Sequence, residues 1–346
     1  MTGRIASSTS TGAFRPFGVT MQRLLYVYEE RVPEGLRQLM LSAFPAAEFA
    51  VETMTYRTPT DDQMRKLAAA EVVFFAPGRH LPDEVIAAGR SVKLMQLWSS
   101  GYDKFNLAGA DKAGIPVANN NGANAWSVAE HAVLLMLAVL KSLPDSHRRT
   151  TTGTWAGNSH GLDMFTLRGK TVGIVGFGRI GQSVAAILRG FGTRTIYFDP
   201  RAVAPERATD LAAVPVPFYT LIEQSDIVTL HLHSAADTDG LISADVFAGM
   251  KRGAVLINVS RARLVDQAAL QRALADGTLR GAGLDVYASE PTRPDDPLLA
   301  MPNVVATPHI AGSTHDAYVA AASMALENFR RVARNELPLG LISRGG

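Results

Sequence analysis

Three short segments in the second half of the chain hold residue types that could do chemistry together. They are NVSR at 258–261, DVYASEP at 285–291 and TPHIAG at 307–312. They offer a permanently charged guanidinium at Arg261, a titratable imidazole at His309 and a carboxylate at Glu290. An arginine can pair with carboxylate and carbonyl oxygens together, and a histidine can exchange a proton near neutral pH. This combination suits hydride exchange between a nicotinamide and a 2-hydroxy or 2-oxo acid.

Each of these residues also has a plainer interpretation. Arg261 could be a surface arginine at the end of a predicted strand over 254–259, and Arg263 stands close by. His309 alone would be an ordinary loop histidine. Because the three occur together, the sequence favours a catalytic set, in which Glu290 orients His309 and stabilises its protonated form.

A glycine-rich motif, GFGRIG at 176–181, directly follows a predicted strand over 171–175 and opens an amphipathic helix. In this context the first glycine permits a tight turn, the second lets a pyrophosphate approach the backbone, and the third lets helix and strand pack closely. The helix N-terminus adds N–H donors and partial positive charge. The alternative is a glycine-rich turn without a ligand. The predicted cofactor-binding residues here are Gly176, Gly178, Arg179, Ile180 and Gly181.

An acidic residue ends the strand that follows the motif. Asp199 stands eighteen residues after Gly181, where a carboxylate can accept hydrogen bonds from ribose hydroxyls and repel a 2′-phosphate. This spacing predicts NAD rather than NADP. Asp199 could instead be a turn residue before Pro200, and the charge of Arg201 could weaken the preference.

Strand and helix signals alternate along the chain, which predicts parallel sheets covered by helices. The length of 346 residues favours two domains. The first part has predicted strands at 24–28, 72–75 and 94–98, with helices at 34–44, 61–69 and 83–89. A long helix over 124–143 ends near Pro144. The second part has six predicted strands, which would form a doubly wound dinucleotide-binding sheet. They are 171–175, 195–198, 227–232, 254–259, 282–286 and 304–306, with helices at 267–276 and 314–335.

The order and wording of these segments resemble the D-isomer-specific 2-hydroxyacid dehydrogenase family, from about Leu24 to about Asn335. The resemblance implies an α/β protein with two doubly wound parallel-sheet domains. A flavodoxin-like substrate-binding domain would be discontinuous, at 21–122 and 313–346, because the last helix returns to it. A Rossmann-type NAD-binding domain would occupy 123–312. Residues 1–20, rich in Ser, Thr and Gly, are expected to form a disordered extension.

The resemblance also implies roles for individual residues. Arg261 would anchor the substrate, with His309 and Glu290 as the acid–base pair, and Asp285 would hold the nicotinamide carboxamide. The loop SSGYD at 99–103 resembles the family loop whose backbone N–H groups hold the substrate carboxylate, although a plain turn would look similar. Further cofactor contacts would be His231, Val259, Ser260 and Gly312, and further substrate contacts Ser99, Ser100, Gly101 and Arg79.

Three features qualify this assignment. Arg79 lies on a loop that could face the substrate, but a solvated arginine fits its position equally well. His233 stands where the family usually has proline, and Ala262 stands where it usually has glycine, so the backbone there must avoid a glycine-only conformation.

Composition limits the class of partner. The chain is 47% hydrophobic and 19% charged with a net charge of +2, so no strong field invites nucleic acid or an anionic membrane. It has no cysteine, which excludes disulfides and fits a reducing cytoplasm. The spacing of acids and histidines predicts no metal site. The expected partners are a small 2-oxo or 2-hydroxy acid and, by the resemblance, a second copy of the chain paired through the 124–143 helix.

Two other functions remain open. The resembled family includes transcriptional corepressors that keep the fold and the three catalytic residues, so a nucleotide-sensing binding protein is one alternative. Phosphite oxidation is another, although that relative carries a lysine where this loop has Ser100. The sequence does not identify the 2-oxo acid or the preferred direction of reaction.

Overall fold

The computed structural model describes residues 21–155, 157–233 and 237–345, and the predicted extension at 1–20 lies outside these described residues. The chain divides into two compact units, each considered by itself. The first unit contains the described residues through Leu97, together with Lys104–Ala118 and the chain from Asn328 onward. The second unit comprises Trp98–Asp103 and Asn119–Glu327.

This division differs from the predicted domain boundaries of 122/123 and 312/313. The Trp98–Asp103 segment belongs to the second unit because hydrogen bonds tie it to the turn after Ala118. Asn120 donates from its Nδ2 to the Trp98 carbonyl at 2.9 Å and from its backbone N–H to the Ser99 carbonyl at 3.3 Å. Helix α13 (His315–Ala333) begins in the second unit and ends in the first.

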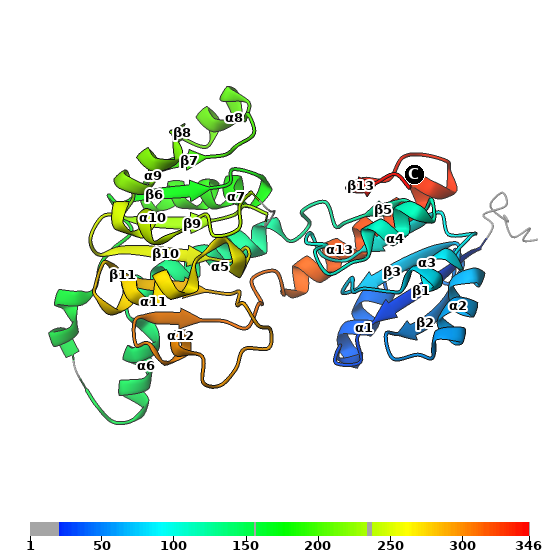
Figure 1. The fold of residues 1–346 in the computed structure, drawn as a ribbon, viewed down its shortest axis with the longest axis horizontal. Coiled ribbons are helices and arrows are strands. Elements are labelled where there is room, and N and C mark those ends of the chain that lie inside the picture. The colour runs from blue at the N-terminus through cyan, green and yellow to red at the C-terminus, as the bar shows by residue number, and fades with distance from the viewer. Residues whose placement is uncertain (1–20, 156, 234–236, 346) are drawn as a thin grey trace, which may run out of the picture. The chain divides into compact units, whose positions relative to one another are not determined.

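The first unit is built on a six-stranded sheet in the order β13-β5-β4-β3-β1-β2 (Figure 1). Strands β1 to β5 are parallel, and β13 runs antiparallel to β5. The order β2-β1-β3-β4-β5 is that of a flavodoxin-like sheet, which confirms the predicted fold of this part. The strands are β1 (Gln22–Tyr28), β2 (Phe49–Thr55), β3 (Val72–Ala76), β4 (Leu94–Leu97), β5 (Val117–Ala118) and β13 (Leu341–Ser343). The helices are α1 (Glu34–Leu41), α2 (Thr60–Ala69), α3 (Asp83–Ala87) and α4 (Leu107–Lys112).

Three strands of this sheet lack the pattern that predicts a strand. Strand β2 lies at the edge, and only Phe49 and Met54 of its seven residues are buried. Strands β5 and β13 have two and three residues. Strand β3, by contrast, is central and buried throughout, so its VVFFA run is apparent from the sequence.

The second unit contains a seven-stranded parallel sheet in the order β12-β11-β10-β9-β6-β7-β8. Six of its strands match predicted ones, and the order around the β6/β9 pair is that of a Rossmann sheet. Strand β8 was not predicted, because it is short and only its first residue is buried. The strands are β6 (Thr171–Val175), β7 (Arg194–Phe198), β8 (Ala213–Pro215), β9 (Ile227–Leu230), β10 (Ala254–Asn258), β11 (Leu279–Leu284) and β12 (Val304–Ala306).

The predicted long helix over 124–143 is two helices in the structure. Helix α5 (Ala125–Leu140) ends before Ser142, which has a left-handed φ of 47°. Pro144 lies in the first turn of α6 (Leu143–Thr151), where the missing proline N–H costs no hydrogen bond. Pro144 therefore begins a helix rather than ending one. The remaining helices of this unit are α7 (Arg179–Leu188), α8 (Pro205–Asp210), α9 (Phe218–Gln224), α10 (Ala244–Gly249), α11 (Gln267–Ala275) and α12 (Pro297–Ala300), with 3₁₀ turns η1 (Gly157–Asp163), η2 (Arg189–Phe191) and η3 (Ala262–Leu264).

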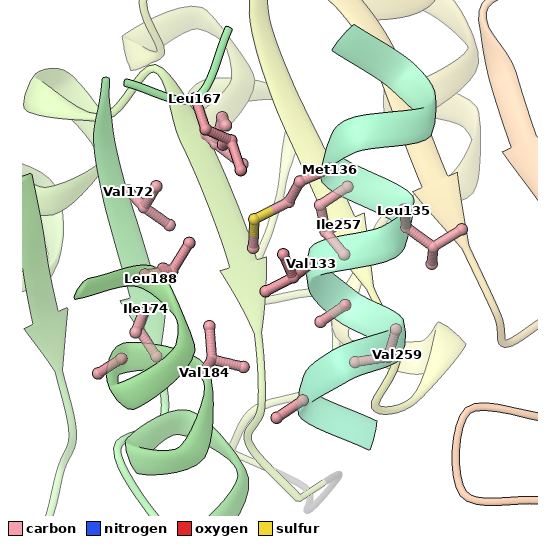
Figure 2. Close-up of a cluster of buried hydrophobic side chains, with 14 of the residues drawn as sticks. Val133, Leu135, Met136, Leu167, Val172, Ile174, Val184, Leu188, Ile257 and Val259 are labelled. Carbon is pink, nitrogen blue, oxygen red and sulfur yellow. The ribbon is translucent and has the colours of Figure 1, made fainter. Parts of the chain in front are cut away.

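Helix α5 supplies much of the core on one face of this sheet. Val133 and Met136 of α5 face Ile174 of β6, Leu188 of α7 and Ile257 of β10 (Figure 2). Each of these side chains is nearly inaccessible to solvent, and burying one stabilises the fold by roughly 1.5–3 kcal/mol. This packing fixes the sheet that carries the residues of interest.

The parallel arrangement brings the predicted site residues to one edge of the sheet. Adjacent parallel strands end at the same edge, and β6, β9, β10, β11 and β12 are neighbours. The glycine motif follows β6, His231 follows β9, Arg261 follows β10, Asp285 follows β11, and His309 follows β12. Ligands of such sheets bind outside this edge.

Candidate active site

The glycine motif forms an open cradle at the N-terminus of α7. Gly176 has a φ of 95°, and a Cβ there would lie 2.7 Å from the His231 carbonyl carbon. A Cβ at Gly181 would lie 2.2 Å from the Gly176 oxygen. Both positions therefore require glycine. A Cβ at Gly178 would meet nothing within 4 Å, so the backbone is open there to an approaching ligand. The residues fit a dinucleotide pyrophosphate at the helix N-terminus.

Arg179 and Ile180, the two residues between Gly178 and Gly181, make different contacts within the protein. Arg179 donates from Nη2 to the Asn121 side-chain oxygen at 2.8 Å and lies against Gly122, where a Cβ would be 2.4 Å from the arginine Cδ. Ile180 packs its side chain against the core. A cofactor would therefore meet the backbone of Ile180 rather than its side chain.

Asp199 is tied into the loop that follows β7. Its carboxylate accepts hydrogen bonds from the Phe177 N–H at 2.7 Å and the Arg201 N–H at 2.8 Å, and its side chain is 4% exposed. The Arg201 side chain is exposed, with Nε 3.8 Å from Asp199. The turn-forming and ribose-binding roles of Asp199 are thus compatible. A cavity of about 500 Å³ adjoins it, lined by Phe198, Ala202 and other residues of this edge.

His231 is a neutral imidazole with an unused nitrogen. Its Nε2 lies 2.9 Å from Thr229 Oγ1, whereas Nδ1 is buried without a hydrogen-bond partner among the described residues. The residue as a whole is partly exposed, but burial of the ring lowers the pKa of His231 to about 3. A polar ligand group in the cradle could satisfy Nδ1, which supports the predicted cofactor role.

Arg261 is held from both sides. Its Nε and Nη2 donate to Asp103 Oδ2 at 2.9 and 2.6 Å, and its Nη1 donates to the Ser260 carbonyl at 2.8 Å. The buried Asn258 fixes the backbone, because its side chain donates to the Arg261 carbonyl and accepts from the Ser260 N–H. Ala262 begins η3 without a left-handed φ, so alanine is tolerated there.

The Ser99–Asp103 loop lies against Arg261. The Ser100 hydroxyl is within 2.6 Å of Asn120 Oδ1 and 2.8 Å of Asn124 Oδ1, so it is occupied by the protein itself. In the described part of the chain, neither the Ser100 N–H nor the Gly101 N–H has a hydrogen-bond acceptor. Unpaired backbone donors beside a guanidinium form a pocket for an anion. The Ser99 hydroxyl donates to the Gly101 carbonyl at 2.7 Å and shapes the loop.

His309 and Glu290 are in contact. His309 Nδ1 lies 2.9 Å from Glu290 Oε1, and the Tyr287 N–H donates to the same oxygen at 3.3 Å. The histidine side chain is 47% exposed and the glutamate 23% exposed. His309 has a φ of 56°, a conformation that is rare for residues other than glycine.

Asp285 holds the loop that carries His309. Its buried carboxylate accepts hydrogen bonds from Thr307 Oγ1 at 2.6 Å, the Ile310 N–H at 2.9 Å and the Ala311 N–H at 2.8 Å. Three of its four acceptor positions are therefore used within the protein. The predicted contact with the nicotinamide carboxamide would have to use what remains, so the structure adds a positioning role that the sequence did not suggest.

His131 supports the same loop from α5. Its Nε2 lies 2.9 Å from Thr307 Oγ1 and 3.7 Å from Asp285 Oδ1. Burial lowers the pKa of His131, and the charge of Asp285 opposes this shift. The structural role expected of this histidine is consistent with these contacts.

The other predicted site residues fall into two groups. Val259 is buried, the Ser260 hydroxyl donates to the Leu232 carbonyl, and a Cβ at Gly312 would lie 2.6 Å from Asn124 Nδ2, so these three shape the edge of the sheet. Arg79 lies in the first unit, where its side chain pairs with Glu29. Arg261 lies in the second unit, so the predicted substrate contact of Arg79 stays a prediction.

Three residues of the site have no role in the sequence-based prediction. Asp103 belongs to the recognised loop SSGYD, and Asn258 begins the recognised segment NVSR, but nothing in the sequence shows which side chains they hold. Thr307 likewise precedes His309 by two residues. Among the described residues, no group of three histidine, aspartate or glutamate side chains could hold a metal ion. Within the same residues no single helix could cross a membrane, and only the pair α5 and α6, bent by 63°, has the length and apolarity.

A family model, a curated relative and a solved structure all match this chain over most or a large part of its length. The family model of the D-isomer specific 2-hydroxyacid dehydrogenase NAD-binding domain matches residues 133–311. The chain is 37% identical to a glyoxylate reductase of Korarchaeum cryptofilum over 263 residues, which cover 75% of this chain and 79% of that protein. The apo-structure of Escherichia coli D-lactate dehydrogenase superposes with a TM-score of 0.76 at 26% identity, covering 92% of this chain and 100% of that one.

A second group of relatives is longer. The chain is 36% identical to a D-3-phosphoglycerate dehydrogenase of Archaeoglobus fulgidus over 275 residues, which cover 79% of this chain. The match covers 51% of that protein, so the chain spans about half the length of this relative.

The neutral state of His231 predicts a pH dependence of stability. Its pKa is about 3 when folded and 6.5 in the reference state, so the unfolded chain binds the extra proton between these values. Stability therefore falls as pH is lowered from 7 towards 4.5, by up to about 2–3 kcal/mol from this residue. Urea unfolding at both pH values should show a smaller loss in His231→Gln than in the parent protein. Equal losses would show that His231 is not held neutral.

Proposed function

Because this chain belongs to the D-isomer specific 2-hydroxyacid dehydrogenase family, we propose that Arg261 anchors the substrate and that His309 with Glu290 forms its acid–base pair. The protein is an NAD-dependent oxidoreductase that acts on 2-hydroxy or 2-oxo acids. The observation that carries the proposal is the 2.9 Å contact of His309 Nδ1 with Glu290, on the same sheet edge as Arg261.

The anchor follows from the hydrogen bonds of Arg261. A guanidinium has five N–H donors, of which the described contacts use three. One donor on Nη1 and one on Nη2 remain, and with the N–H groups of Ser100 and Gly101 they would bind the carboxylate and carbonyl oxygens of a 2-oxo acid.

The proton route follows from the histidine contact. Since Nδ1 faces Glu290, Nε2 is the nitrogen that would give a proton to the carbonyl oxygen during reduction and take it back during oxidation. The carboxylate of Glu290 would stabilise the imidazolium and fix the ring. When bound at the cradle, the reduced nicotinamide supplies the hydride that the substrate carbon accepts. Gly176, Gly178 and the α7 N-terminus would hold its pyrophosphate.

The relatives favour this function over the alternatives. The matched proteins are named as a glyoxylate reductase and dehydrogenases, and neither a corepressor nor a phosphite-oxidising protein is favoured by them. A small 2-oxo acid such as glyoxylate is the proposed substrate, because that relative is matched over most of its own length.

A homodimer is part of the proposal. Helices α5 and α6, the η1 turn and the connection between α6 and η1 carry large apolar side chains that are each more than half exposed, which suits a protein–protein interface. They are Trp126, Leu134, Leu143, Trp155 and Leu162. A cytoplasmic location is also proposed, since a chain without cysteine suits a reducing compartment.

Arg261→Ala tests the anchor. Loss of the guanidinium would leave a substrate carboxylate without its partner, at a cost of roughly 2–5 kcal/mol, or about 30-fold to several thousand-fold in kcat/KM. A panel of 2-oxo acids followed by NADH absorbance measures this, and the Kd for NADH should change little. Near-normal turnover of the panel by Arg261→Ala would place the anchor elsewhere.

Asp199 should set the choice of cofactor. Its carboxylate lies at the end of β7, where a 2′-phosphate would meet like charge. We expect a higher kcat/KM with NADH than with NADPH, and Asp199→Asn should narrow the difference. A preference of the parent protein for NADPH would mean that Arg201 outweighs Asp199.

The His309–Glu290 pair should control proton transfer. Reduction takes a proton from His309 and oxidation returns one to it. Glu290→Gln keeps the shape but removes the charge that stabilises the imidazolium, so its kcat for 2-oxo acid reduction should fall below that of the parent. His309→Ala should lower both rates about 100-fold or more. An unchanged kcat in Glu290→Gln would show that the two side chains are not coupled.

A further inference from the structure

The contact of Asp103 with Arg261 is the one strong interaction of the anchor that the proposed reaction does not use. Asp103 Oδ2 accepts hydrogen bonds from Nε and Nη2, which form one edge of the guanidinium plane. Both residues belong to the second unit. The Asp103 side chain is 47% exposed and the Arg261 side chain 29% exposed, so neither is buried in the core.

We propose that Asp103 is a positioning residue: it holds the Nε edge of Arg261 and so presents the remaining N–H donors of Nη1 and Nη2 to the substrate. This inference rests on the proposed role of Arg261 as the substrate anchor. It assigns Asp103 a task in the reaction without contact with the reacting atoms.

The N–H donors of Arg261 are divided between the protein and the proposed substrate. The Ser260 carbonyl takes one N–H of Nη1, and Asp103 takes the Nε N–H and one N–H of Nη2. What is left is one donor on each of two neighbouring nitrogens, the arrangement that binds two oxygen atoms at once. A long side chain held at three points also loses less conformational entropy when it binds a ligand.

The loop at Gly101 is shaped to fit against the guanidinium of Arg261. A Cβ at Gly101 would lie 1.9 Å from Arg261 Nη2, and Gly101 does not have a left-handed φ. A side chain at this position would therefore displace the guanidinium, which lies against the Gly101 backbone. The same loop thus brings both Asp103 and the backbone of Gly101 against the arginine.

The charge of Asp103 also suits a positioning role. Burial would raise the pKa of its carboxyl, but the charge and hydrogen bonds of Arg261 lower the pKa below its ordinary value. Asp103 therefore remains ionised near neutral pH and keeps the stronger, charge-assisted form of the hydrogen bond.

A competing hypothesis for Asp103 predicts the opposite change in KM. Asp103 could occupy the place of the substrate carboxylate and compete with it. In that case, its removal would free Arg261 and lower KM. In the positioning account, its removal lets the guanidinium turn away and raises KM.

The test compares Asp103→Ala, Asp103→Asn, Arg261→Ala and the double variant Arg261→Ala/Asp103→Ala, with glyoxylate and NADH as probes. Asp103→Ala should raise KM for glyoxylate about 10- to 100-fold, the scale of a misplaced catalytic contact. Asp103→Asn should recover part of this, since its amide oxygen can still accept from Nε and Nη2. The double variant should have a KM no higher than that of Arg261→Ala, as expected for two residues that act as one unit. The Kd for NADH should stay within about twofold of the parent value.

A matched control is Asp62→Ala. Asp62 pairs with Arg65 on α2 in a similar carboxylate–guanidinium contact that is exposed and outside the site. Its kinetics should equal those of the parent. Gly101→Ala offers an independent variant, because it should displace Arg261 and raise KM while leaving Asp103 in place.

Three results would overturn the inference. They are a lower KM in Asp103→Ala, an unchanged KM, or the same loss from Asp103→Ala in the Arg261→Ala background as in the parent. Failure of the proposed function is separate, because it requires that Arg261→Ala itself retain near-normal kcat/KM.

Discussion

The buried carboxylate of Asp285 is the constraint on which the sheet edge with the proposed catalytic residues depends. It cannot be left without hydrogen bonds, because an unpaired buried charge costs several kcal/mol or more. Its partners are the Thr307 hydroxyl and the N–H groups of Ile310 and Ala311, which bracket His309 on both sides. The backbone N–H of Asp285 donates to the Asn258 carbonyl at 3.0 Å, and the Asn258 side chain in turn fixes the backbone at Arg261. One residue at the end of β11 thus supports the histidine loop and adjoins the arginine loop.

This support explains how His309 tolerates its backbone. A residue other than glycine with a φ of 56° costs of order 1–3 kcal/mol in an otherwise relaxed loop. Three charge-assisted hydrogen bonds to Asp285 offset that cost, and His131 adds a fourth polar contact through Thr307. These contacts hold the imidazole of His309 with Nδ1 facing Glu290, which leaves Nε2 for the proposed proton transfer.

The sequence predicts the fold well where residues are buried in regular patterns. The strands with continuous apolar runs, such as β3 and β6, are apparent because both faces are covered. The edge strand β2 and the short strand β8 are not predicted from the sequence, because few of their residues are buried. The break between α5 and α6 is also not predicted, because a proline can either end a helix or begin one. In the structure, the left-handed conformation of Ser142 separates the two helices and Pro144 lies in the first turn of α6.

The site follows a similar division. The glycine motif and the set of Arg261, Glu290 and His309 are predicted from residue type and order, and the structure brings Glu290 and His309 into contact. The residues that position them cannot be predicted in this way. Asp103 lies 158 positions from Arg261 in the sequence, and Asp285 and Thr307 are ordinary polar residues until the fold brings them together. Contact between distant segments is a property of packing, which local pattern does not reveal.

The most direct test of this account is the kcat for 2-oxo acid reduction by Asp285→Asn at saturating NADH. Asparagine keeps the size of the side chain, but its NH₂ would face one of the two backbone donors at Ile310 and Ala311 that a carboxylate satisfies. The account predicts a misplaced His309 loop and a fall in kcat of about 100-fold. A kcat close to that of the parent protein would contradict the claim that Asp285 holds His309 in place for the proposed proton transfer.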